Sequence, residues 1–293
     1  ISCIEHTASK RILQLFENTI THCRTQHTTT QSLKPIMVKY KDAIFLKIDH
    51  NTRQYAITCP ARHHEEIMNL FVLDTKHFRV IKPFDIIGDF IVGEDVEESV
   101  MKYTRSRLNR EWLPHTWRYK PPGISYIYIM VKDDGVRFRP IGSSSPLPHA
   151  RLLSLVSMAL NTILRHSNLK HATLWTTHTM KEHIAQLNQR AQEHNLYIHF
   201  EILDVKNFYT EIDKTRLRDR LRYMCKRYAA HNRTQYVSVP KYGKDPKPKP
   251  GKDNSGRYYT FHIQMLLDIV FMALDTAFFK VGLVILLQIL GLV

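Results

Sequence analysis

The stretch FEILDVKNFYTEI, residues 200–212, is the most informative part of the sequence for the fold of this chain. It continues an apolar run, LYIHFEILDV (196–205), which is typical of a buried strand that ends on an acid. Asp204 closes that run and Val205 follows it, so the carboxylate is expected to be held rigidly beside the next loop. Oxygen ligands in such a place can bind a hard divalent cation, and the alternative is a side chain that only caps the following turn.

A second segment, SYIYIMVKDDGVRFRPIG (125–142), predicts a β-hairpin, because Asp-Gly between two strand-like runs is a strong turn signal. Three cations surround the expected turn: Lys132, Arg137 and Arg139. Such cations can bind a triphosphate, Arg through its planar fork and Lys as a point charge. The alternative is a solvated basic sheet edge.

Mixed α and β signals surround these two segments. Apolar spacing predicts helices at 9–20, 65–73, 95–110, 149–166, 179–194 and 214–228, and strands at 36–48 and 53–59. Residues 240–256 are rich in Pro, Gly and Lys and predict a flexible loop. Residues 261–293 are strongly apolar, but Asp268, Asp275 and Lys280 interrupt them, which favours a core segment over a membrane span.

The charge is uneven along the 293 residues, which carry 42 Lys and Arg against 27 Asp and Glu, a formal net charge of +15. Residues 65–98 hold nine acids and three bases, whereas residues 214–257 hold fourteen bases and three acids. Another basic cluster at 102–120 is interleaved with Tyr and Trp. A basic excess predicts a polyanionic partner, and cations mixed with aromatic rings are typical of nucleic-acid surfaces.

Four irregularly spaced cysteines argue against a disulfide scaffold and favour a reducing, intracellular location. The N-terminal residues lack the pattern of a signal peptide. Zinc is a weaker possibility, since none of the candidate groups has the paired spacing of a structural zinc site. These groups are Cys59 with His63 and His64, Cys3 with His6, and His22 with Cys23. Asp133 and Asp134 could also bind a metal, but in a Lys-Asp-Asp-Gly turn they more plausibly fix the turn geometry.

Taken together, the segments resemble the reverse transcriptases. VKDDGVRFRPIGSSS (131–145) looks like the fingers hairpin of that family, and FEILDVKNFYTEI looks like its first palm motif. The tail FFKVGLVILLQILGLV resembles the approach to the next palm motif, with Gln288 and Gly291 matching a Gln-x-x-Gly pattern. The combination is most similar to Penelope-like elements, and it covers roughly residues 110–293. The family's Asp-Asp motif is absent from the chain, so the resemblance implies that this motif lies beyond Val293.

The resemblance implies a role for each matching residue. Asp204, helped by the carbonyl of Val205, would bind catalytic Mg²⁺, and Tyr209 would exclude a ribose 2′-OH. Lys132 and Arg139 would contact the incoming deoxynucleoside triphosphate. The residues expected to bind the RNA template and DNA primer are Arg137, Arg216, Arg220, Gln288 and Gly291.

The sequence therefore predicts an α/β (α+β) protein with the fingers and partial palm of a right-hand polymerase. Residues 1–110 receive no function, 111–195 are fingers-like, and 196–293 are a partial palm with a basic insertion at 240–256. The expected activity is RNA-directed DNA synthesis in an intracellular, nuclear setting, with this chain an inactive piece of a longer enzyme. The alternatives are a non-catalytic nucleic-acid-binding protein with a decayed polymerase fold, and a basic protein anchored to a membrane by residues 261–293.

Overall fold

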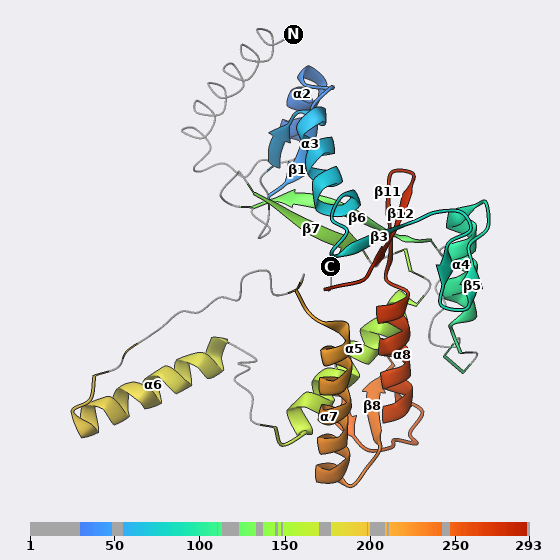
Figure 1. Ribbon diagram of the computed structural model, residues 1–293. Helices are drawn as coiled ribbons and strands as arrows, with labels where there is room; N and C mark the ends of the chain where they lie inside the picture. Colours follow the sequence, from blue (N-terminus) through green and yellow to red (C-terminus); the bar gives the residue numbers. More distant parts are fainter. Residues whose placement is uncertain are drawn as a thin grey trace. The chain divides into compact units, whose positions relative to one another are not determined.

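Helices and strands are interspersed along the chain (Figure 1). The computed structural model describes residues 30–48, 55–109, 111–112, 123–132, 137–143, 146–147, 149–169, 177–197, 199, 209, 211–241 and 247–291. In these ranges the helices are α2 (Thr30–Lys39), α3 (Pro60–Ile67), the π-helical η1 (Met68–Val72), α4 (Val96–Ser106), α5 (Ala150–His166), α6 (Thr177–His194), α7 (Lys214–Asn232) and α8 (Ile263–Asp275). The strands are β1 (Ile44–Lys47), β2 (Tyr55–Thr58), β3 (Phe78–Ile81), β4 (Ile86–Ile87), β5 (Phe90–Ile91), β6 (Ser125–Val131), β7 (Phe138–Ser143), β8 (Tyr236–Pro240), β9 (Lys249–Pro250), β10 (Tyr258–His262), β11 (Phe278–Val281) and β12 (Val284–Gln288). The mixed α/β class expected from the sequence is confirmed.

Two compact units divide the chain. One comprises residues 1–70 and 128–141, and the other comprises 71–127 and 142–293. Strand β6 begins in the second unit and ends in the first. The functional segments expected from the sequence, 1–110, 111–195 and 196–293, follow other boundaries and stay predictions.

Strands β6 and β7 form the expected hairpin. β6 alternates buried and more exposed residues, and the main-chain N–H of Lys132, directly after β6, donates at 2.8 Å to the carbonyl of Arg137, directly before β7. Both strands were predicted from the Asp-Gly signal, and both are confirmed. The expected strand at 36–48 is wrong in its first part, because α2 continues to Lys39. The N–H of Tyr40 donates to the carbonyl of Ile36, a helical bond, and only β1 remains extended.

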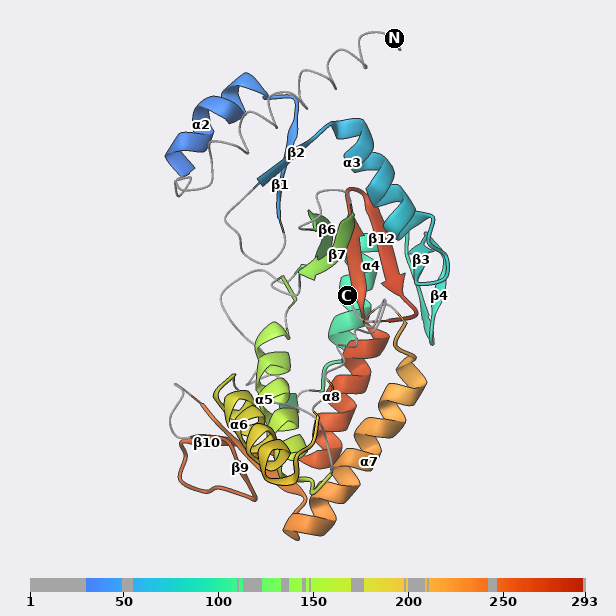
Figure 2. The same ribbon diagram turned by 90° about the vertical axis from the view of Figure 1, so that its left-hand side faces the viewer.

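A helical layer and a small sheet form the larger core of the second unit. Helices α5, α7 and α8 pack against one another, as both views show (Figures 1 and 2), and one face of the sheet β10–β8–β9 packs against them. Val237, Val239 and Phe261 are at most 1% exposed on that face of the sheet. Burying such side chains is the main stabilising contribution, roughly 1.5–3 kcal/mol for each large apolar side chain.

A five-stranded mixed sheet, in the order β3–β12–β11–β6–β7, contains the strands formed by the apolar C-terminal segment. β11 and β12 form an antiparallel hairpin through Gly282, whose φ of +57° is one that a residue without a side chain adopts readily. β12 also pairs with β3, so residues far apart in the sequence lie side by side. Tyr103 of α4 and Phe278 of β11 pack in the second core cluster.

The prediction that residues 261–293 form a core segment is confirmed for the residues described, since α8, β11 and β12 bury most of their apolar side chains. Among the described helices, none has the length and apolar character needed to cross a membrane.

The strand expected from residue 196 does not begin there. The N–H of Leu196 donates to the carbonyl of Ala191, and Asn195 has a φ of +49°, so these residues end α6 in a left-handed cap. Leu196 and Tyr197 are exposed. In the rest of the expected strand 196–205 only His199 is described, and residues 198 and 200–205 lie outside the described part of the chain.

Residues 240–256 are not only a loop. Residues 240–241 and 247–256 of this segment are described: Pro240 ends β8, and the later part contains β9, which pairs with β8. Pro250 fits there because β9 is at the edge of its sheet, where a strand residue without an N–H is tolerated. The Oγ of Ser238 donates to the carbonyl of Gly251 at 2.8 Å, which ties the following turn to the sheet.

Candidate functional site

Two segments singled out by the sequence meet in the second unit. The motif-like stretch 200–212 ends at Ile212, and the main-chain N–H of Gly291 donates to the carbonyl of Ile212 at 3.0 Å. Gly291 is buried and has a φ of +78°, a backbone conformation that favours glycine. The glycine of the Gln-x-x-Gly pattern thus lies directly against the end of the first motif.

Lys214 strengthens this junction from the first turn of α7. Its Nζ donates to the carbonyl of Gln288 and, at 2.8 Å, to that of Leu274 in the last turn of α8. The last carbonyls of a helix lack partners within it, so the lysine satisfies one of them. Burial lowers the pKa of Lys214 to about 8, with Asp275 opposing and Arg218 adding to that shift.

Glu211, the residue before Ile212, is held by a separate loop. Lys76 Nζ lies 2.7 Å from both Glu211 carboxylate oxygens, and this hydrogen bond is the main cause that lowers the pKa of Glu211. The ring of His77 lies between two carboxylates, with Nδ1 2.6 Å from Asp74 Oδ2 and Nε2 3.5 Å from Glu211 Oε1. The same loop bonds to the segment after β12, because the carbonyl of His77 accepts the N–H of Ile289 at 2.8 Å. Three segments, 74–77, 211–214 and 288–291, therefore converge.

Gln288 carries an unusual feature of this junction. The residue is 3% exposed, and its side-chain Nε2 has no hydrogen-bond partner among the residues that the structure describes. Its main-chain N–H donates to the carbonyl of Ala277, so the strand itself is satisfied. A buried amide without a partner costs roughly 1–3 kcal/mol.

Some of the predicted site residues cannot be placed. Asp204 and Val205 lie outside the described residues, as do Asp133 and Asp134. Tyr209, the expected sugar-selecting residue, is described and is 68% exposed. No group of three or more His, Cys, Asp or Glu side chains in the described part of the chain is arranged to hold a metal ion. The expected Mg²⁺ site is thus left as a prediction.

The expected nucleotide-binding cations lie in the first unit. Lys132 follows β6 and is partly buried, Arg137 is exposed before β7, and Arg139 lies within β7 and is partly buried. Arg62 of α3 lies over the ring of Phe138 at 5.8 Å, which adds a further cation to this hairpin. Cys59, one of the zinc candidates, is used locally, since its Sγ caps α3 by accepting the N–H of Arg62.

Arg216 and Arg220, predicted to bind template and primer, are both exposed on α7. The helix begins directly after the converging loops, and Asp213 caps it by accepting the main-chain N–H groups of Thr215 and Arg216. These hydrogen bonds lower the pKa of Asp213, the bond from Arg216 being the larger cause.

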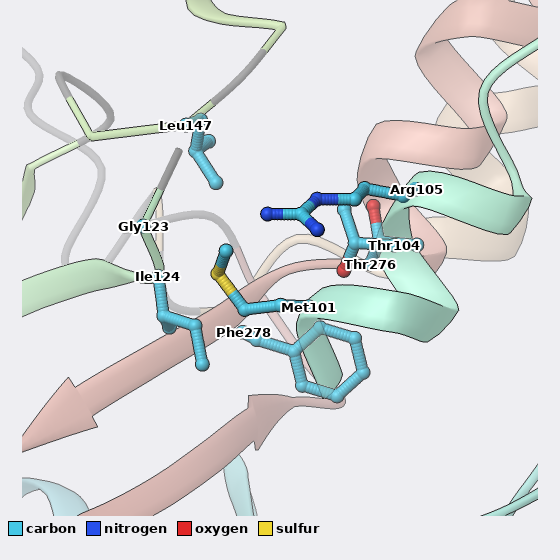
Figure 3. Close-up of a pocket in the computed structure, with 8 residues that line it drawn as sticks. All are labelled: Met101, Thr104, Arg105, Gly123, Ile124, Leu147, Thr276 and Phe278. Atoms are coloured by element: carbon cyan, nitrogen blue, oxygen red, sulfur yellow. The ribbon is translucent and has the colours of Figure 1, made fainter. Parts of the chain in front are cut away.

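A cavity of about 10 Å³ in the second unit is too small for a substrate and has room for about one water molecule. Figure 3 shows Arg105 reaching across it towards Leu147, above Met101 and Phe278. An open cleft of about 360 Å³ lies between the end of α4 and α8 and is lined by Arg107, Trp112 and Asp275 among others. Arg105, Arg107 and Trp112 belong to the basic and aromatic cluster at 102–120, but neither hollow is lined by a residue predicted to bind Mg²⁺, nucleotide, template or primer.

Sequence reasoning missed the residues that hold the junction together: Lys76, His77, Glu211 and Lys214. Lys76 and Glu211 are 135 positions apart, and no local pattern links them. Lys214 does carry a signal, because a cation at the start of a helix opposes the helix dipole and needs another reason to be there.

Comparisons of the chain with models of protein families, with curated proteins and with solved structures find no match.

Proposed function

We propose that the chain is part of a template-directed nucleotidyltransferase that resembles the reverse transcriptases and copies RNA into DNA. The proposal rests on the resemblance of residues 200–212, 131–145 and 288–291 to three motifs of that family. Its fold would be the fingers and part of the palm.

The contact between Gly291 and Ile212 is the observation that carries this proposal. The two residues are far apart in sequence, and the resemblance places them in successive palm motifs. Palm motifs border one site, so the resemblance requires these segments to be neighbours. The hydrogen bond between them at 3.0 Å, and the bond from Lys214 to Gln288, support this requirement.

In the proposed reaction the primer 3′-OH attacks the α-phosphate of a deoxynucleoside triphosphate, and pyrophosphate leaves. Asp204 and the carbonyl of Val205 would hold Mg²⁺, which supplies charge stabilisation for the transferring phosphoryl group. Lys132 and Arg139 would bind the triphosphate, Tyr209 would select the sugar, and Gln288 would orient the template–primer.

The test is incorporation of labelled deoxynucleotides by the protein at its natural, gene-encoded length, on an RNA template with a DNA primer and Mg²⁺. Asp204→Asn is expected to lower incorporation by about 100-fold or more, on the scale of losing a group that stabilises transition-state charge. Asp89→Asn is the matched control, since it makes the same change at a carboxylate that is 85% exposed on the turn between β4 and β5.

Two results would count against the proposal. Equal incorporation by Asp204→Asn and Asp89→Asn would remove Asp204 from the reaction. No incorporation by any version, together with retained binding to RNA–DNA duplex, would favour the non-catalytic nucleic-acid-binding protein instead.

A further inference from the structure

The cations of α7 fall into two groups with different surroundings. Helix α7 carries seven Lys and Arg and one acid, Asp219. Three of the cations have partners within the fold. Lys214 binds main-chain carbonyls, Arg218 pairs with Asp275, and Arg222 pairs with Asp219 at 3.0 Å. Arg218 and Arg222 also lie over the ring of Phe271, at 5.6 and 4.8 Å.

The other four cations, Arg216, Arg220, Lys226 and Arg227, are exposed. Within the described parts of the chain, no ion pair is formed by any of them. Asp213 lies close enough to Arg216 for the two charges to interact, but its carboxylate already accepts two main-chain N–H groups as the helix cap. Ion pairing with the described residues therefore does not explain why these cations are present.

Helix geometry places most of these exposed cations in one line. Arg216, Arg220, Tyr223 and Arg227 are spaced by four, three and four residues, which puts them on one face of a helix, over a length of about 16 Å. We call these four residues the α7 stripe. The opposite face bears Cys225 and Tyr228, both at most 1% exposed, so the stripe faces away from the core.

The stripe costs the isolated protein stability. Arg216 and Arg220 are like charges at i and i+4, which repel by about 0.2–0.5 kcal/mol in a helix. Arg216 also lies in the first turn, where the helix dipole favours anions over cations. A bound polyanion would reverse both effects, because phosphates are attracted by the arginines and by the amino end of the helix.

Tyr223 decides which polyanion fits. Tyr223 is 50% exposed and lies between Arg220 and Arg227 on the stripe. An aromatic side chain is not needed at this position to pack against either arginine. In a duplex the bases are stacked on one another, whereas unpaired bases stack on protein rings while nearby cations follow the backbone. The arrangement matches a single strand and offers nothing specific to a lipid surface.

We propose that the α7 stripe binds single-stranded nucleic acid, with the three arginines on successive phosphates and Tyr223 stacked on an unpaired base. This deepens the proposed function and rests on it only for the source of the strand, which would be the unpaired template. RNA and DNA share the chemistry that the stripe recognises.

The experiment measures binding of the full chain to fluorescently labelled 20-nucleotide RNA and DNA of one sequence by anisotropy, over a range of salt concentrations, without nucleotides. For a single strand, log K falls with log salt by about 0.7 per phosphate contacted. Arg220→Gln with Arg227→Gln is expected to weaken binding and to reduce that slope by about 1.4. Tyr223→Ala is expected to weaken binding roughly 5- to 150-fold with the slope unchanged, and Tyr223→Phe to restore it.

The matched control is Lys181→Gln with Arg190→Gln, which removes two exposed charges from α6 and is expected to leave affinity and slope as in the wild type. If the stripe and control variants bind alike, the inference is wrong. Tighter binding of a duplex or of anionic vesicles than of either single strand would also overturn it. Asp204→Asn is expected to bind normally, so failure of polymerisation and failure of this inference give different results.

Discussion

At the scale of single residues, Lys214 shows how the candidate site is held in place. One ammonium group joins the start of α7, the end of α8 and the end of β12 through two main-chain carbonyls. Its burial depresses the pKa to about 8, so the charge is retained near neutral pH at a cost in solvation. This residue therefore links the packing of three elements to the position of Gln288.

Replacing this lysine tests the link. Lys214→Met keeps the length of the side chain but leaves both carbonyls without their partner, so it is expected to destabilise the protein by about 1–3 kcal/mol at pH 7. Denaturant unfolding measures the change. Lys181→Met, at an exposed position on α6, is the control and is expected to have little effect.

The same lysine predicts a dependence on pH. Below about pH 8 the folded and unfolded chains both hold the proton. Between about 8 and the ordinary pKa of 10.5, the unfolded chain binds more protons than the folded one, so stability rises with pH. Unfolding at pH 7.5 and 9.5 is expected to show the wild type gaining stability relative to Lys214→Met. No gain, or a loss, would mean that the ammonium is not buried as described.

Residue identity was predictable where spacing carries information. Gln288 and Gly291 were selected because they match the Gln-x-x-Gly pattern of the family that the chain resembles, and the structure sets them against Lys214 and Ile212, while their binding role stays a prediction. The role of Lys76 was not predictable, because its partner Glu211 is brought near only by the pairing of β3 with β12. Contacts that depend on tertiary pairing leave no local pattern in a single sequence.

At the scale of elements, α7 is a helix with one face in the core and one basic face. The sequence predicted a helix at 214–228, and in the structure this helix continues to Asn232. Tyr228 anchors the buried face, since its ring is fully buried and its hydroxyl donates to the carbonyl of Tyr236 at 2.8 Å. Burial raises the pKa of this phenol to about 12, so the hydroxyl stays a donor over the physiological range.

The two tyrosines of α7 provide a matched pair. Tyr228→Phe removes one buried hydrogen bond between α7 and β8 and is expected to cost about 1 kcal/mol of unfolding free energy. Tyr223→Phe, at the half-exposed position, is expected to change stability by less than about 0.5 kcal/mol. Thermal or denaturant unfolding measures both, and equal effects would contradict the assignment of the buried face.

Elements were predictable where local chemistry is strong, as at the Asp-Gly hairpin and in α5. They were not predictable where tertiary contacts decide. β9 lies in a segment of Lys, Pro and Gly, and it is extended because β8 offers a partner edge. The hairpin β11–β12 comes from an almost continuous apolar run with no alternation, so only the pairing with β3 and β6 determines its conformation.

At the scale of the whole molecule, the basic excess has a structural distribution. Within residues 214–257, some cations hold the fold together and others form the exposed α7 stripe. Bulk charge alone predicts a polyanion, while the division between paired and exposed cations indicates where one would bind. The catalytic hypothesis depends instead on a few residues that contribute little to the net charge.

The most direct test of the central claim is the sequence of the product made by the protein at its natural length. It would be given a heteropolymeric RNA template, a DNA primer, four deoxynucleoside triphosphates and Mg²⁺. The account predicts DNA complementary to the template, made by the wild type and by Asp89→Asn but not by Asp204→Asn. A product that ignores the template, or equal product from Asp204→Asn, would contradict it.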